Sequence, residues 1–111
     1  MTKTVHRAIR TGWLYEGTLT DKAFRRRPKD LDGLSVSSTH DSAKRSLQSG
    51  AGVAALAVLK VEQLGLQVAC SGSHGTILGL PFDIPENYSR VIEFADRLRD
   101  IAEFSKDPWQ M

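Results

Sequence analysis

The basic block Arg25, Arg26, Arg27 and Lys29 is the densest group of residues in the chain that could do chemistry. Positive charge gives affinity for phosphate, and aromatic rings offer surfaces on which bases stack. Three aromatic residues precede the block: Trp13, Tyr15 and Phe24. One interpretation is therefore an RNA-binding patch. The other is a solvated basic turn in which Arg27 pairs with Asp30 or Asp32, and the small net charge of +2 favours this second interpretation.

The loop Ser71-Gly72-Ser73-His74-Gly75 is a second candidate. Successive backbone amides in such a loop can form an anion-binding nest, in which His74 could act as a general acid or base. The alternative is an ordinary turn, because glycine-rich loops are common. Cys70 precedes the loop, but it ends an apolar segment and is expected to be a buried, inert thiol. The histidines at 6, 40 and 74 lack the spacing of metal ligands, so no metal site is predicted.

A cluster of hydroxyls ends the segment from Gly33 to Thr39, which is predicted to be a strand followed by a helix cap. Alternation places Leu34 and Val36 on one face of this strand and Ser35 and Ser37 on the other. These serines lack the Gly-x-Ser-x-Gly pattern of a hydrolase nucleophile. The glycine-flanked apolar run over 52–59 predicts another strand, which could lie beside the first.

The periodicity of the chain predicts a single α+β domain over residues 1–104, with a small mixed β-sheet of four or five strands. Further strands are predicted over 4–9, 66–70 and 76–78. From 85 to 104 apolar residues recur at helical spacing, which indicates an amphipathic helix covering one face of the sheet. The opposite face is left for function or for a partner, and residues 105–111 are predicted to be a loose tail. The predicted core positions are Val5, Ile9, Leu34, Val36, Val53, Leu56, Val58, Leu66, Val68, Val91, Ala95, Leu98 and Ile101.

Length and composition limit the class of protein. A chain of 111 residues fits one domain with a genuine core. A single cysteine excludes an internal disulfide and indicates a reducing compartment. No apolar region of signal-peptide length follows the first residues, and the longest apolar run is far too short to cross a bilayer. We therefore expect a cytoplasmic protein without membrane contact.

Two blocks of residues resemble an uncharacterised group of small bacterial proteins. The first block is Ala23-Phe24, Arg27-Pro28 and Asp32-Gly33-Leu34-Ser35-Val36, and the second is Leu64-Gly65-Leu66, Val68, His74, Ile77 and Leu80-Pro81. This resemblance implies a bacterial setting. It also directs attention to Arg27, Ser35 and His74 as binding residues.

The order of elements is similar to that of ADP-ribosyltransferase folds, which place a His or Arg on the first strand, a Ser-Thr-Ser-like segment on a later strand, and a Glu further on. His6-Arg7 and Ser37-Ser38-Thr39 match the first two parts. Glu62 is the only acid near the place expected for the third. The resemblance implies NAD as the cofactor and His6, Arg7 and Ser37 as catalytic residues. The alternative is that His6 and Arg7 are ordinary strand residues and the serines cap a helix.

Three functions therefore remain open. The favoured prediction is a non-enzymatic binding module of a bacterial cytoplasmic system, of toxin–antitoxin type or with an operon-encoded partner, which binds a protein or a second copy of itself. The second is a small NAD-handling enzyme of ADP-ribosyltransferase type, for which a cleft joining His6 to Ser37 would be the mark. The third is an RNA-binding module that uses the block from Arg25 to Lys29.

Overall fold

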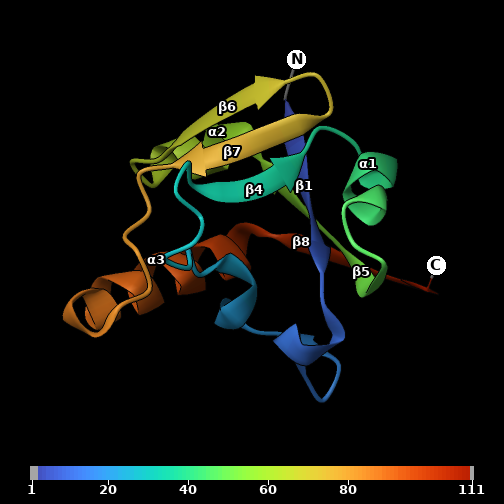
Figure 1. Cartoon of the computed structure of the whole chain (residues 1–111), viewed down its shortest axis with the longest axis horizontal. Helices are drawn as coiled ribbons and strands as arrows, with labels where there is room; N and C mark the ends of the chain where they lie inside the picture. The colour runs from blue at the N-terminus through green and yellow to red at the C-terminus, as the bar shows by residue number, and fades with distance from the viewer. Residues whose placement is uncertain (1–2, 111) are drawn as a thin grey trace.

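The structure is a computed structural model that describes residues 3–110, and it confirms the predicted α+β class (Figure 1). The strands are β1 (Thr4–Ile9), β2 (Leu14–Tyr15), β3 (Thr18–Leu19), β4 (Leu34–Ser37), β5 (Ser49–Ala57), β6 (Gln67–Ser71), β7 (His74–Leu78) and β8 (Glu103–Gln110). The α-helices are α1 (His40–Arg45), α2 (Val58–Gln63) and α3 (Tyr88–Ile101). Short 3₁₀ turns η1 (Thr11–Trp13), η2 (Asp21–Phe24) and η3 (Pro85–Asn87) connect them.

Six strands form the main sheet in the order β6-β7-β4-β1-β5-β8, and each pair of neighbours is antiparallel. The sheet therefore has more strands than expected and is antiparallel where a mixed sheet was expected. The sequence allowed β4 and β5 to lie side by side, but β1 lies between them. In Figure 1, β4, β7 and β6 lie together on one side of β1, with β5 and β8 on the other.

The ladder between β1 and β4 is the weak point of the sheet. These two strands are partnered at one position only, His6 opposite Ser37, whereas β1 and β5 are partnered along the whole of β1. Beyond that single pair the two strands diverge. We call the gap between them the opening.

The predicted loose tail is an edge strand, so that prediction was wrong for the part of the tail that the structure describes. Strand β8 pairs with β5, and glycines on β5 permit its close approach. A Cβ atom at Gly52 would lie 2.2 Å from the Ser105 carbonyl oxygen, and one at Gly50 would lie 2.4 Å from the Trp109 ring. Met111, the last residue of the predicted tail, lies outside the described residues.

Two predicted elements are shorter than expected. Thr39 caps α1 through a reciprocal capping box with Ser42, and α1 ends at Arg45, before β5 begins at Ser49. The helix predicted from 85 begins with the 3₁₀ turn η3, and α3 follows from Tyr88. The C-terminal helix ends at Ile101, since Phe104 pairs with Ala54 as part of β8. Likewise the strand expected over 53–59 ends at Ala57, where α2 follows.

The main core lies between α3 and one face of the sheet and includes most predicted core residues. Val58, Val68 and Ile101 are only partly buried at its margin. On the opposite face Ala8 and Val53 pack with Ala43 of α1, beside Leu47 and Trp109. The second face is therefore partly covered by α1, where an uncovered face was expected. Among the helices of the described chain, none has the length and apolar character needed to cross a membrane.

Candidate functional site

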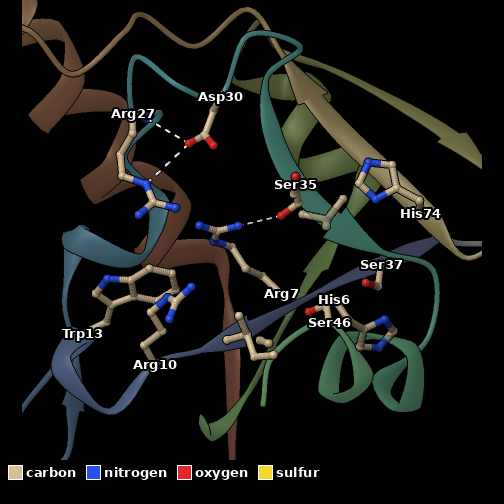
Figure 2. A pocket seen from close by; sticks show the side chains of 13 residues that line it. His6, Arg7, Arg10, Trp13, Arg27, Asp30, Ser35, Ser37, Ser46 and His74 are labelled. Carbon is tan, nitrogen blue, oxygen red and sulfur yellow. Dashed lines mark hydrogen bonds and ion pairs between the residues drawn. The ribbon is translucent and has the colours of Figure 1, made fainter. Parts of the chain in front are cut away.

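A cavity of about 260 Å³ occupies the opening between β1 and β4 (Figure 2). Most of the candidates predicted from the sequence line it, although they come from three strands and a loop. They are His6, Arg7, Arg27, Ser35, Ser37 and His74. A cleft joining His6 to Ser37, the expected mark of a nucleotide-handling site, is therefore present.

The cavity has access to side chains from both faces of the sheet because the sheet is open there. Successive side chains of a strand point to opposite faces, so His6 and Arg7 point in opposite directions. Arg7 shares its face with Val5 and Ile9 of the main core, and His6 shares its face with Ser37 on β4. In a continuously paired sheet these two neighbours could not line one cavity. The missing ladder between β1 and β4 brings them together.

Arg7 lies at the centre of the cavity wall, and its side chain is only 9% exposed. Its Nε donates a hydrogen bond to the Ala23 carbonyl (2.5 Å), and its Nη1 donates one to the Ser35 carbonyl (2.6 Å), across the opening. Burial lowers the pKa of Arg7 to about 10, so the guanidinium stays protonated at neutral pH. Within residues 3–110 no carboxylate lies within 4 Å of it. A buried charge is stable only when something compensates it. Here two backbone carbonyls and the Trp13 ring contact the guanidinium, and the Asp30 carboxylate, beyond ion-pair distance, also favours its charged form.

Trp13 and two further arginines form the outer end of the cavity. The guanidinium carbons of Arg7 and Arg10 lie 5.0 and 5.7 Å from the centre of the Trp13 ring, at cation–π distance. Arg27 is exposed, and its Nε lies 3.7 Å from Asp30 Oδ2, which also accepts a hydrogen bond from the Arg27 amide (3.0 Å). This confirms the predicted Arg27–Asp30 pair. Trp13 therefore positions arginines, and it is less free to stack on a base than the sequence suggested.

His6, Ser37 and His74 form a row across three neighbouring strands at the inner end of the cavity. Ser37 is the register partner of His6 on one side and of His74 on the other, so all three side chains lie on one face (Figure 2). Since adjacent strands lie about 4.8 Å apart, the two histidine α-carbons are separated by roughly 10 Å, with Ser37 between them. Burial, and secondly the nearby His40, lower the pKa of His6. Its Nδ1 atom is buried and has no hydrogen-bond partner in the described chain.

A second polar cluster adjoins His6 from the side of α1. Asp107 of β8 accepts hydrogen bonds from His40 (3.0 Å) and Lys44 (2.9 Å), and these lower the pKa of Asp107. The His40 ring meets the His6 ring edge-on, with 6.3 Å between centroids. The sequence did not indicate this cluster, because residue 107 was placed in a loose tail.

The structure divides the basic block instead of presenting it as one patch. Arg25 forms an ion pair with Asp21 (2.7 Å), and Arg26 donates to three backbone carbonyls and stacks 3.9 Å from the Phe82 ring centre. Both side chains are thus used within the fold. Lys29 is exposed and does not line the cavity. Only Arg27 of the block reaches the cavity, so the four residues do not form the continuous nucleic-acid surface that was proposed.

Cys70 and Glu62 lie elsewhere than expected, and Arg10 joins the site without having been predicted. Cys70 is exposed, because β6 is an edge strand, and it is not the buried thiol expected. Glu62 is exposed on α2 and does not line the cavity, so the acid implied by the ADP-ribosyltransferase resemblance is not at the site. Arg10 was not among the candidates, although its position directly after β1 and next to Trp13 was a usable signal.

No family model, no curated protein and no solved structure matches the chain. The two resemblances stated from the sequence therefore stay predictions. What the geometry offers chemically is a small cavity with an excess of positive charge, two imidazoles and several serine hydroxyls.

Proposed function

We propose that this protein binds a small phosphate-bearing ligand, a nucleotide or a sugar phosphate, in the cavity between β1 and β4. The observation that carries the proposal is Arg7, a buried guanidinium that faces the cavity and has no carboxylate within 4 Å among residues 3–110. An anion in the cavity would supply a countercharge at contact distance, closer than Asp30. Guanidinium groups bind phosphate through paired hydrogen bonds, and such bonds to charged groups are about twice as strong as neutral ones.

The rest of the lining supports phosphate over a single carboxylate. Arg10 and Arg27 add two more positive charges at the outer end, while Ser35 and Ser37 add hydroxyl groups suited to sugar or phosphate oxygens. Asp30 is the only carboxylate in the lining, and it is already paired with Arg27. This excess of positive charge matches a group that carries more than one negative charge.

The size of the cavity limits what it encloses. At about 260 Å³ it is slightly smaller than the roughly 300–1,000 Å³ typical of sites that enclose drug-sized ligands. It fits a phosphate with one adjoining sugar, and a dinucleotide would extend beyond it.

A second candidate is NAD handling of the ADP-ribosyltransferase type, which the cleft joining His6 to Ser37 favours. We infer that binding of part of NAD is compatible with the cavity, whereas transfer lacks the expected acid, since Glu62 lies elsewhere. The prediction of a protein partner has less support. The large exposed apolar side chains, Tyr15, Leu31, Leu59 and Tyr88, belong to four separate parts of the chain.

Thermal denaturation with and without inorganic phosphate, AMP or NAD tests the proposal. A ligand at a hundred times its Kd adds about 2.7 kcal/mol, which raises the midpoint of a domain of this size by roughly 10 °C. Arg7→Met should abolish the rise, and Arg27→Met should reduce it. Arg97→Met is the matched control, because Arg97 is exposed on α3 and paired only with Glu93.

The result that contradicts the proposal is equally specific. If none of the three ligands raises the midpoint, or if the rise is the same in the Arg7 and Arg27 variants, the cavity is not an anion site. Arg27 is exposed, so its replacement should not disturb folding. The test therefore remains decisive even if the Arg7 variant folds poorly.

A further inference from the structure

Two histidines face the same cavity from strands on either side of Ser37. We propose that His6 and His74 act as a general base and a general acid that cleave a ribonucleotide phosphodiester, with the neighbouring 2′-hydroxyl as the nucleophile. This inference rests on the proposed phosphate site and adds a reaction to it.

The spacing of the two side chains suits a phosphodiester between them. His6 and His74 occupy the two positions directly opposite Ser37, so their rings rise from the same face of the sheet. With roughly 10 Å between their α-carbons, the two side chains leave space for one phosphate group between them. Ser37, between them, is placed to donate its hydroxyl hydrogen to a non-bridging phosphate oxygen. A base and an acid on opposite sides of one phosphorus atom are what an in-line displacement requires.

The reaction needs no co-reactant. The 2′-oxygen attacks the adjacent phosphorus, so that a P–O2′ bond forms and the P–O5′ bond breaks. His6 accepts the 2′-hydroxyl proton, and His74 donates a proton to the departing 5′-oxygen. The products are a 2′,3′-cyclic phosphate and a free 5′-hydroxyl, and atoms and charges balance once the two histidines exchange protons with water.

The arginines supply the charge that this step needs. The transition state carries additional negative charge on the phosphoryl oxygens, and preorganised cations stabilise it more than they stabilise the substrate. Arg7 is hydrogen-bonded to the Ser35 carbonyl, two residues along β4 from Ser37, which corresponds to roughly 7 Å along the strand. That separation suits contact with the reacting phosphate or with the next phosphate of the same strand.

The surroundings of His6 agree with its role as the base. Burial and the nearby His40 lower the pKa of His6, so it is unprotonated and able to accept a proton at neutral pH. The charged groups around it are Arg7 on the same strand, His40 and Lys44 on α1, and Asp107 on β8. His74 is exposed on the other side of Ser37, so solvent reaches its ring.

The experiment uses the full-length protein and a labelled single-stranded RNA oligonucleotide of mixed sequence. Cleavage should yield 2′,3′-cyclic phosphate ends, and the all-deoxy oligonucleotide should bind without being cut. Removal of either histidine should lower the rate by about 10²–10⁴-fold, the usual contribution of a general acid or base. His74→Ala is the safer variant because His74 is exposed, and added imidazole should partly restore its activity.

Four results separate the possible failures. Cleavage that is equal in wild type, His6→Ala and His74→Ala would show a contaminating nuclease and overturn the inference, with Arg97→Met prepared in parallel as a control. Binding of the deoxy oligonucleotide without cleavage of RNA would also overturn it, while leaving the phosphate site intact. Failure of imidazole to restore His74→Ala would argue that His74 has a structural role only. Absence of phosphate or nucleotide binding would remove the proposed function itself.

Discussion

The two halves of the sheet are built alike but joined differently. One half, β1-β5-β8, is held by ladders that run the length of its strands, and the other half, β4-β7-β6, is paired in the same way. Between the halves, β1 and β4 are partnered only at His6 and Ser37. Long ladders join the strands within each half, with one register shift on β5 between Gly50 and Gly52, whereas the junction is open and is crossed by the side chain of Arg7. Every residue assigned a role in the proposals lies at or beside this junction.

The contrast shows how a small antiparallel sheet can hold a cavity without a long insertion. Backbone groups that no longer pair must find other partners, since unpaired buried groups are costly. The Ser35 carbonyl accepts from Arg7 across the opening. The Arg7 guanidinium thus takes the place of a strand hydrogen bond at Ser35, and the same guanidinium faces the proposed ligand site.

The largest expected loss of stability follows from removal of β8, the edge strand of the first half. A chain that ends at Ala102 lacks β8 and loses the packing of Phe104 and Trp109, both half-buried. Full burial of such a side chain contributes about 1.5–3 kcal/mol, so the two half-buried rings contribute about that much together, and each lost strand hydrogen bond adds about 0.5–1.5 kcal/mol. The free energy of unfolding should therefore fall by about 3–6 kcal/mol in urea titrations. Removal of only residues 110–111 is the control. If the chain ending at Ala102 were as stable as the full chain, the tail would be loose after all.

A smaller loss of stability is expected when Gly33, the residue before β4, is replaced. Gly33 has a φ of 133°, and a Cβ there would lie 2.4 Å from the Ile77 carbonyl oxygen. Gly33→Ala should cost about 2–3 kcal/mol through backbone strain and should also weaken phosphate binding, because it displaces the start of β4. Gly12→Ala is the matched control, since nothing lies within 4 Å of its Cβ position. Unchanged binding in a destabilised Gly33 variant would show that the cavity does not depend on where β4 begins.

The smallest expected effect is on the pH dependence of stability, to which His6 at the junction contributes. The pKa of His6 is lowered on folding, so the unfolded chain binds more protons between the two pKa values and stability rises with pH there. The contribution of His6 is complete above the ordinary histidine value of about 6.5 and is lost as pH falls through the folded pKa. Asp107, whose pKa is also lowered, titrates at much more acidic pH. His6→Gln should flatten the pH dependence of the unfolding free energy near pH 6, and an unchanged slope would contradict this.

Local patterns were sufficient for much of the fold. Alternation over Leu34–Ser37 predicted β4, and the β-branched ends of the segment Thr4–Ile9 predicted β1, both with their observed bounds. The helical spacing after Pro85 predicted α3. The sequence offered Ser38, Thr39 or Asp41 as the cap of a helix, and Thr39 caps α1. These features depend on neighbours within a few residues, which the sequence displays directly. His6, Arg7 and Ser37 became candidates through the resemblance to ADP-ribosyltransferase folds, and His74 through its glycine-rich loop and the resemblance to small bacterial proteins.

Only the tertiary structure decided how these candidates meet. The position of β1 between β4 and β5, the pairing of β8 and the single contact at the junction depend on residues far apart in the chain. The sequence could not show that Arg25 and Arg26 are used within the fold while Arg7 is left without a carboxylate. Burial and strand order determine which charged groups keep an ion-pair partner, and among residues 3–110 the buried Arg7 has none within 4 Å. The sequence by itself determined which chemical groups the protein carries. The pairing of strands that are distant in the chain decided that these groups line one cavity.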